Sequence, residues 1–378
     1  LSDLLALAEP YFVPDIHGLL VGNNLIKAHL DLDQLDAAQS ILDKLYALNR
    51  PDYQQNLRFW DTEIAKARVE KAVAPKSASF EMLSVEGPVW LVPNSEGSSL
   101  FLNKDTNTDA FAVIGGTAEI ANPSETVKMQ LADTVGRLTR ALPLFIAEQI
   151  GLRTTAHATT LVPWIVENHG ASFVLNGNRW SDKDVIELAR RNAARNRYVV
   201  TLHLKSAQEP WSVDVRVLRV QDERLLRSFS HTLDETRLEA SIPKLTGDLI
   251  ASLVDQNLAQ SVEPSPLYKV PEGCHFADYL LRLEQLLALR CASMETTPRG
   301  FLNNEREIIE GNIGLCADYP HNFTLRLLLA KSLLALSRVR PDIMPEFETK
   351  LAVLGRDQPM DAECQKVIDA VIAKAISK

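Results

Sequence analysis

The chain has 378 residues, of which 46% are hydrophobic and 24% are charged. It can therefore bury a sizeable core, and its length predicts two or three domains rather than one. A formal net charge of −9 at pH 7 argues against broad electrostatic attachment to nucleic acid or to anionic lipid.

No apolar run in the sequence approaches the roughly 18 residues that a membrane-spanning helix needs, so we expect no membrane span. The first residues, LSDLLALAEPYF, lack the basic head and the small-residue cleavage site of a signal peptide. We therefore expect a cytoplasmic protein, with export left open because the chain does not start with methionine. The spacing of Cys274, Cys291, Cys316 and Cys364 matches neither a CxxC metal site nor a compact disulfide framework, which favours buried free thiols.

Residues 1 to 73 are predicted to form helical hairpins. Apolar positions recur at helical spacing in HGLLVGNNLIKAHLDL and again in DAAQSILDKLYALNRP, and the polar turn DLDQLD separates the two. Pro51 then suits the first turn of a third helix. Because one helical hairpin cannot bury its own apolar face, these helices must stack on neighbours.

This first segment resembles a tetratricopeptide repeat. Leu25 falls at the large apolar position of the first helix, and Ala38 falls at the small position of the second. Ile26 and His29 stand where the repeat usually has a small residue and a tyrosine. The resemblance implies a helical array that presents an interaction surface.

The repeat register also implies where a partner would bind. Asn23 and Lys27 are four residues apart and so share one helix face. They fall at inner-groove positions, where the resembling family places Asn and Lys to hold a peptide backbone or a terminal carboxylate, and an ammonium beside an amide suits that task. The alternative is a polar helix side over an ordinary core. We take Asn23, Lys27 and Asp31 as candidate residues for binding another protein or peptide.

Residues 74 to 108 are predicted to link two domains. AVAPKSAS has the composition of a linker, and NSEGSSLFLNKDTNTD is rich in turn-forming residues. Between them, GPVWLVP is expected to form a short apolar strand bracketed by prolines. A domain boundary is therefore expected in this region.

Residues 109 to 260 alternate strand and helix patterns. AFAVIG is the first expected strand, and a long helix is expected from Ser124, with Leu131, Leu138 and Phe145 on its apolar stripe and a kink at Pro143. RTTAHATT is the second strand, and SDKDVIELARRNAAR begins with a capping box. Alternating residues in RYVVTLHLKS, WSVDVRVLRV and ERLLRSFSHTL predict an antiparallel meander, and SIPKLTGDLIASLVDQNL predicts a covering helix.

Three stretches in this order of elements resemble the TolB amino-terminal-like domain, namely GRLTRALPLFIAEQIGLRTTAHATT, VIELARRNAARNRYVVTLHLK and WSVDVRVLRVQDERLL. That domain occurs in bacterial proteins that also carry tetratricopeptide repeats. The likeness covers residues 109 to 260 and includes no catalytic signature. It implies a non-enzymatic module for interaction or sensing.

Residues 261 to 378 begin with the Pro-rich linker SVEPSPLYKVPEG and continue as helical pieces that end in prolines. Pro320 and Pro359 follow the second helices of two pairs, and Leu329 with Ala330 match the large and small step of the repeat. This part also resembles degenerate tetratricopeptide-type hairpins. The predicted fold class is α+β multidomain, with tetratricopeptide-like helical hairpins flanking a mixed α/β sandwich.

Gly115 and Gly116 follow the first expected strand and raise the question of a nucleotide site. A dinucleotide site needs three glycines and a helix directly after them, but the next glycine is Gly136 and Pro123 intervenes before the helix. No P-loop lysine follows. We interpret the pair as a strand exit, with a small-molecule site at Gly115 and Gly116 as the alternative.

The sequence predicts neither a metal site nor a catalytic centre. The eight histidines form no HExxH helix and no Cys/His cluster. A pair of His203 and His231 facing each other across the meander is one alternative, and magnesium at Asp182, Asp184 and Glu187 is another. Acidic residues at a helix start are better explained by the helix dipole. GxSxG motifs are absent from the sequence.

We therefore expect a non-enzymatic, bacterial-type scaffold or adaptor that mediates protein–protein interaction through helical-repeat surfaces and an α/β interaction domain. No cofactor and no metal are expected, and a homo-oligomer stays open. One alternative is a small-molecule sensor that binds near Gly115 and Gly116. The other is an unrecognised hydrolase or transferase, because catalytic residues can converge from distant positions.

Overall fold

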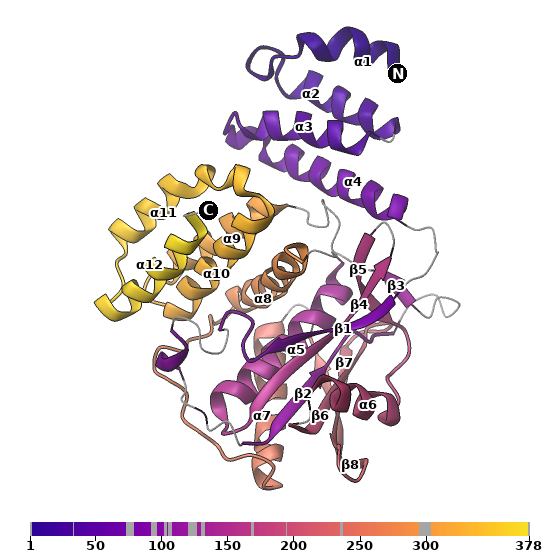
Figure 1. Cartoon of the computed structure of the whole chain (residues 1–378), viewed down its shortest axis with the longest axis vertical. Helices are drawn as coiled ribbons and strands as arrows, with labels where there is room; N and C mark the ends of the chain where they lie inside the picture. The colour runs from indigo at the N-terminus through magenta and orange to yellow at the C-terminus, as the bar shows by residue number, and fades with distance from the viewer. Residues whose placement is uncertain are drawn as a thin grey trace. The chain divides into compact units, whose positions relative to one another are not determined.

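The computed structural model divides the chain into two compact units and combines helices with a mixed sheet (Figure 1). The first unit comprises Leu1–Ala78, Glu167–Gly170 and Thr297–Glu307, and the second comprises Ser79–Val166, Ala171–Thr296 and Ile308–Lys378. The residues that the structure describes are 2–32, 34–72, 79–91, 97–101, 104, 108–119, 127–129, 133–167, 170–193, 195–234, 237–294 and 304–376.

The first unit is helical. Its helices are α1 (Ser2–Ala8), α2 (Pro14–Asp31), α3 (Leu35–Tyr46) and α4 (Gln54–Ala72). The two helices expected from apolar spacing are confirmed as α2 and α3. The third is confirmed as well, because a 3-10 turn at Pro51–Tyr53 leads directly into α4.

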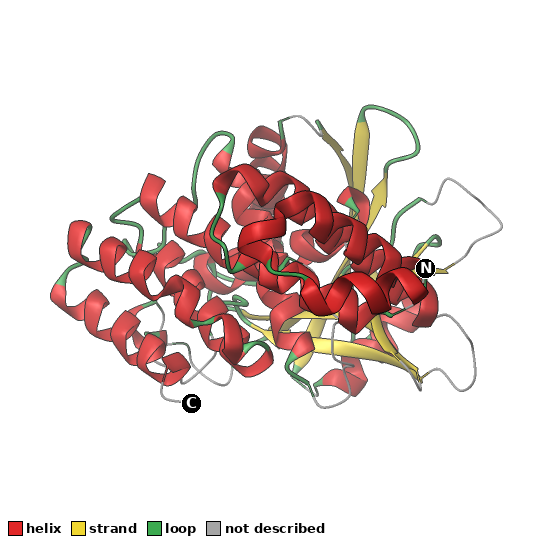
Figure 2. Cartoon of the chain, turned by 90° about the horizontal axis from the view of Figure 1, so that it is seen from above, coloured by secondary structure: helices red, strands yellow, loops and turns green. Residues whose placement is uncertain are grey.

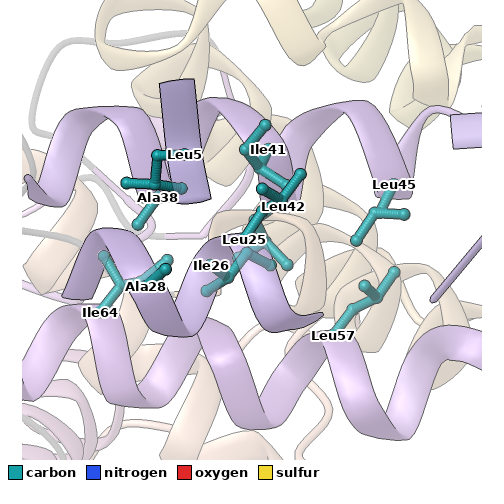
Figure 3. Packing of buried hydrophobic residues seen from close by; sticks show 10 residues of the cluster. All are labelled: Leu5, Leu25, Ile26, Ala28, Ala38, Ile41, Leu42, Leu45, Leu57 and Ile64. Atoms are coloured by element: carbon teal, nitrogen blue, oxygen red, sulfur yellow. The ribbon is translucent and has the colours of Figure 1, made fainter. Parts of the chain in front are cut away.

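The core of the first unit lies between these helices (Figure 3). Leu25 of α2 is 1% exposed and Ala38 of α3 is 0% exposed, so the large and small positions noted in the sequence are both buried. The buried side chains that meet there are Leu5, Leu25, Ile26, Ala28, Ala38, Ile41, Leu42, Leu45, Leu57 and Ile64. Each helix therefore buries its apolar face against its neighbours, as stacked hairpins require.

The second unit contains a mixed sheet, whose strands are yellow in Figure 2. The strands are β1 (Ser79–Glu86), β2 (Ala110–Ile114), β3 (Val127–Met129), β4 (His157–Glu167), β5 (Gly170–Asn176), β6 (Asn196–Lys205), β7 (Trp211–Arg219) and β8 (Arg224–Leu233). Their order is β3-β5-β4-β2-β6-β7-β8, and β1 also pairs with β4. β2 is parallel to β4 and to β6, and β6, β7 and β8 form the antiparallel meander that alternation predicts.

Helices cover both faces of this sheet. On one face α6 (Asp182–Asn192) packs Val185, Ile186 and Ala189 against alternate strand residues. On the other face lie α5 (Thr134–Arg153) and α7 (Leu238–Asp255), followed outward by the remaining helices (Figure 1). These are α8 (His275–Ala292), α9 (Glu305–Asp318), α10 (Phe323–Val339), α11 (Pro345–Asp357) and α12 (Ala362–Ile376). Among the helices described, none is long and apolar enough to cross a membrane.

The prediction of a strand at residues 87–93 is wrong. Residues 87–90 form a bend and a turn, in which Gly87 has φ +67°, and the strand β1 lies just before them. The apolar character of this stretch has another cause, because Trp90 is buried at 0% exposure. Residues 92 and 93 lie outside the described residues.

The start expected for the long helix is also wrong. Asp133 caps α5, with its Oδ1 accepting from the Gly136 amide at 2.7 Å, and β3 occupies residues that the prediction gave to the helix. Ser124, the expected cap, lies outside the described residues. Both residues suit an N-cap, so local preference alone could not separate them.

Gly115 and Gly116 lie where β2 ends against α5. Pro143 has no N–H, so the Thr139 carbonyl lacks its donor within the helix. The Gly116 amide donates to that carbonyl at 3.3 Å. A Cβ on Gly115 would lie 2.4 Å from the same oxygen, and Gly116 has φ +76° with Pro163 against it. The glycine pair is therefore required by the close approach of the strand exit to the helix.

This close approach predicts the effect of adding one methyl group. Gly115→Ala should lower the free energy of unfolding of the second unit by about 1–3 kcal/mol, the usual cost of overpacking. A Cβ on Gly314 of α9 meets nothing within 4 Å, so Gly314→Ala should instead raise stability by about 0.5–1 kcal/mol. Urea denaturation measures both variants, and equal stabilities would contradict the packing role of Gly115.

Candidate functional site

The three candidate partner-binding residues lie along one side of α2. Lys27 and Asp31 are exposed, and Asn23 is half-buried. Trp60 of α4 donates its indole N–H to Asn23 Oδ1 at 2.8 Å. Because an indole can only donate, this bond fixes the amide with its oxygen toward Trp60 and leaves the NH₂ group as a donor. Asn23 and Lys27 therefore both offer hydrogen-bond donors.

Exposed apolar side chains gather on α1, the 3-10 turn Glu9–Tyr11 and the start of α2, the indigo helices of Figure 1. Four of them are about three-quarters exposed and form what we name the apolar ridge: Leu7 (74%), Tyr11 (74%), Ile16 (76%) and Leu20 (76%). Neighbouring Leu5 and Phe12 pack into or against the core, so the ridge residues point away from it. The sequence analysis did not single out this feature.

Leu20 of the apolar ridge lies on the same side of α2 as the candidate residues, and Ile16 is separated from them by a kink at Gly18, which has φ +61°. Leu20 precedes Lys27 by seven residues and Asp31 by eleven, which is close to two and three full helical turns. The side of α2 is thus apolar at one end and charged at the other. Exposed apolar groups beside polar ones are typical of a protein-binding surface.

The space beside Gly115 and Gly116 is nearly filled. The cavity lined by these glycines and by Leu138, Leu142 and neighbouring side chains measures about 10 Å³. That is about the least volume that holds one water molecule. A metabolite at this position would therefore have to displace α5 from the sheet.

One ionisable cluster converges in the second unit, and it was missed by the sequence analysis. Glu148 of α5 is 0% exposed. Its Oε1 accepts from the Tyr268 hydroxyl at 2.6 Å and from the Tyr279 hydroxyl at 2.8 Å. Its Oε2 accepts from the Trp90 indole N–H at 2.7 Å. One carboxyl group thus joins α5 to α8 and to two irregular segments.

The electrostatics of Glu148 follow from its burial. Burial raises the pKa of Glu148 to about 7, while the hydrogen bonds from the two tyrosines and Trp90 act in the opposite direction. The pKa values of Tyr268 and Tyr279 lie well above the usual value. The main cause is burial, and the second is the charge of Glu148. A carboxyl with this pKa has the proton affinity of a general acid or base, but it is sealed from solvent by its own partners.

A second buried polar contact lies on the same helix. Arg140 of α5 and Glu284 of α8 form an ion pair with 2.7 Å between Nη2 and Oε1, and each side chain is 3% exposed. The Arg140 guanidinium also lies over the ring of Phe173, 4.5 Å from its centroid. Removing either charge would leave the other buried without its partner, which is costly.

An open cleft of about 1110 Å³ lies in the second unit beside this helix. Gln149 and Tyr268 belong to its wall, whereas Glu148 does not. Its other walls come from α7, the irregular segment Ser261–Gly273, the start of α8 and the turn between α9 and α10. Sequence patterns gave no sign of it, because α5 and the turn between α9 and α10 lie far along the chain from the stretch Glu239–Phe276 that supplies the rest of the wall.

The metal alternatives find no support in the positions of their residues. Among the residues that the structure describes, no group of three or more His, Cys, Asp or Glu is placed to hold a metal ion. His203 of β6 lies opposite Asp214 of β7, and His231 of β8 lies opposite Val213 of β7. Because β7 lies between the two histidines, the alternative in which they face each other is wrong. Asp182 instead forms an ion pair with Arg216.

The thiol prediction is confirmed in part. Cys291, Cys316 and Cys364 are buried free thiols, and burial raises the pKa of each to about 12. Cys274 is exposed at the cap of α8, which corrects the expectation for that residue.

Comparison with known proteins adds no assignment. A scan against models of protein families finds no match to this chain, and a search of curated proteins finds no match either. The resemblances to tetratricopeptide repeats and to the TolB amino-terminal-like domain therefore stay predictions.

Glu148 predicts a distinct dependence of stability on pH. Its folded pKa of about 7 lies above the value of 4.5 expected for an exposed glutamate, so the folded state holds the proton more tightly than the unfolded state. The contribution of Glu148 to the free energy of unfolding is greatest below pH 4.5. It falls by on the order of 3 kcal/mol as the pH rises through 7. Glu148→Gln should remove this loss.

Urea denaturation at pH 5 and pH 8 measures the effect in both proteins. Burial raises the pKa of Asp61 in the first unit to about 6. Asp61 therefore contributes the same pH dependence of stability to wild type and variant, and the difference in pH dependence between the two proteins is due to Glu148. Identical slopes in the two proteins would contradict the assignment.

Proposed function

We propose that the protein is a non-enzymatic scaffold or adaptor that binds another protein through the apolar ridge and the adjoining side of α2 in its first unit. The observation that carries this proposal is the apolar ridge. Each of its four side chains leaves about three-quarters of its surface in water. Covering all four is worth on the order of 5–9 kcal/mol before the costs of association, so the ridge supplies a substantial part of the driving force for binding.

The partner that fits best is an amphipathic helix of another protein. Helical arrays bury their faces by adding a further helix, so the ridge offers the kind of surface that such a helix covers. Farther along the same side, the Lys27 ammonium and the Asn23 NH₂ group are donors that suit a carboxylate or a backbone carbonyl. The partner helix therefore combines apolar side chains with acceptor groups.

The arrangement of ionisable groups supports a non-enzymatic role over the hydrolase or transferase alternative. Glu148 has the pKa of a general acid or base, yet it is 0% exposed and its oxygens are occupied by three protein donors. A catalytic group must come within hydrogen-bond reach of its substrate. In this position Glu148 stabilises the packing of helices instead.

The two family resemblances are part of the same proposal. Stacked helices with Leu25 and Ala38 buried support a tetratricopeptide-like first unit. In the second unit, the order β2, α5, β4, α6, β6, β7, β8, α7 supports a TolB amino-terminal-like domain, to which β1, β3 and β5 are additions. Four cysteines without a disulfide support a cytoplasmic location.

Charges placed on the apolar ridge should abolish partner binding. The variant Ile16→Lys/Leu20→Lys is compared with Val353→Lys, which changes a 41% exposed residue of α11. Affinity capture from a bacterial extract with mass spectrometry identifies the partner, and calorimetry with the purified partner measures the affinity. The ridge variant should bind at least about tenfold more weakly, and the control should bind like wild type. Equal capture by all three proteins would contradict the proposed surface.

Lys27→Glu should weaken binding of the same partner, because it replaces a donor with a like-charged group opposite the partner's acceptor. The loss should be several-fold at low salt and smaller at high salt, as for a charge at the edge of an interface. Lys44→Glu on α3, also an exposed lysine, is the matched control. An affinity unchanged by Lys27→Glu at low salt would remove Lys27 from the binding surface.

A further inference from the structure

The cleft of the second unit is a built feature of the fold. One wall is the outer side of α7, where Pro243 and Gly247 are exposed and Ile250 is half-buried. The opposite wall is the segment Ser261–Gly273, which we name the strap. The strap has no regular helix or strand, apart from an isolated bridge at its first residue.

Hydrogen bonds hold the strap at both of its ends. The Val262 amide donates to the Arg153 carbonyl at 2.8 Å at the end of α5. At the other end, the Lys269 amide donates to Thr324 Oγ1 at 3.1 Å, and Asn322 Nδ2 donates to the Lys269 carbonyl at 3.1 Å. The cleft is therefore formed without a ligand, which lowers the ordering cost of binding.

The cleft combines an apolar floor with a large volume. The apolar side chains that line it, which we call the floor, include the buried Phe145 and Phe276 and the half-buried Ile250, Val262 and Val270. The volume of about 1110 Å³ lies above the range of roughly 300–1,000 Å³ that is usual for small-molecule sites. These dimensions suit an extended ligand with several apolar groups.

The charges around the cleft are predominantly acidic. Four carboxylates line it against two cationic side chains, which gives a net charge of −2 (2 minus 4). The carboxylates are Glu239, Glu263, Glu272 and Asp318, and the cations are Arg153 and Lys269. Glu239 and Asp318 each have a basic group at 3.9 Å. The strap acids Glu263 and Glu272 are exposed and form no ion pair among the described residues.

We propose that this cleft binds an extended peptide in which basic side chains alternate with apolar ones. The apolar side chains contact the floor, and the basic side chains approach the strap acids Glu263 and Glu272. The apolar lining of the cleft disfavours a ligand made of positive charge alone, such as a polyamine, which has no apolar side chains to place there. This inference concerns the second unit and does not depend on the partner proposed for α2.

Filling the cleft from α7 gives a direct test. A Cβ on Gly247 meets nothing within 4 Å, and Gly247 belongs to the wall of the cleft, so Gly247→Trp adds a bulky side chain at the cleft from an open backbone position. Gly314→Trp on α9 is the matched control, because Gly314 is also open but does not line the cleft. Circular dichroism confirms that both variants fold.

Fluorescence anisotropy of the full chain measures binding of two short labelled peptides, one alternating lysine with leucine and one alternating glutamate with leucine. Wild type should bind the lysine peptide at least about tenfold more tightly than the glutamate peptide. Gly247→Trp should weaken binding of the lysine peptide by about tenfold or more, and Gly314→Trp should not change it. Glu263→Gln/Glu272→Gln should weaken it and reduce its salt dependence.

Four results would overturn the proposal. The first is a wild type that does not bind the lysine peptide, and the second is a preference for the glutamate peptide. The third is unchanged binding by Gly247→Trp and by Glu263→Gln/Glu272→Gln. Spermidine that displaces the lysine peptide at equal concentration would assign the cleft to small cations and would also overturn it.

Discussion

The second unit depends on burying one helix, α5, on every side. Each residue from Leu138 to Leu152 is buried, with the sheet against one side of the helix and α8 against the other. Polar groups inside such a helix must find partners in the protein, because an unpaired buried charge is very costly. Arg140 meets Glu284, and Glu148 meets three donors. These contacts fix α8 on α5.

The cleft is built outward from this helix. Tyr268, which donates to Glu148, belongs to the strap, so the buried carboxyl and one wall of the cleft share a residue. The Arg153 carbonyl at the end of α5 holds the start of the strap. The first unit differs from the second in its surface. Its core residues are buried between the helices, but the four side chains of the apolar ridge remain exposed to water. One unit thus offers a preformed cleft, and the other offers an exposed apolar surface.

Sequence patterns predicted the elements whose causes are local. The spacing of apolar residues predicted α2, α3 and the meander, and the N-cap Ser181 predicted the start of α6. The strand predicted around Trp90 was wrong, because Trp90 is buried in a turn, where it donates a hydrogen bond to Glu148. Glu148 itself was missed because its donors lie far from it in sequence. Gly115 and Gly116 were interpreted correctly as a strand exit, but the cause, the missing N–H of Pro143, shows only in three dimensions.

Native-state hydrogen exchange of the full chain tests the central place of α5 most directly. If the second unit is organised around this helix, its amides between Leu138 and Leu152 should exchange only through global unfolding of that unit. Their protection free energies should then equal the unfolding free energy from denaturation and match those of β6 and β7. Exchange of α5 amides at clearly lower free energy than those of β6 and β7 would contradict the central role of the helix.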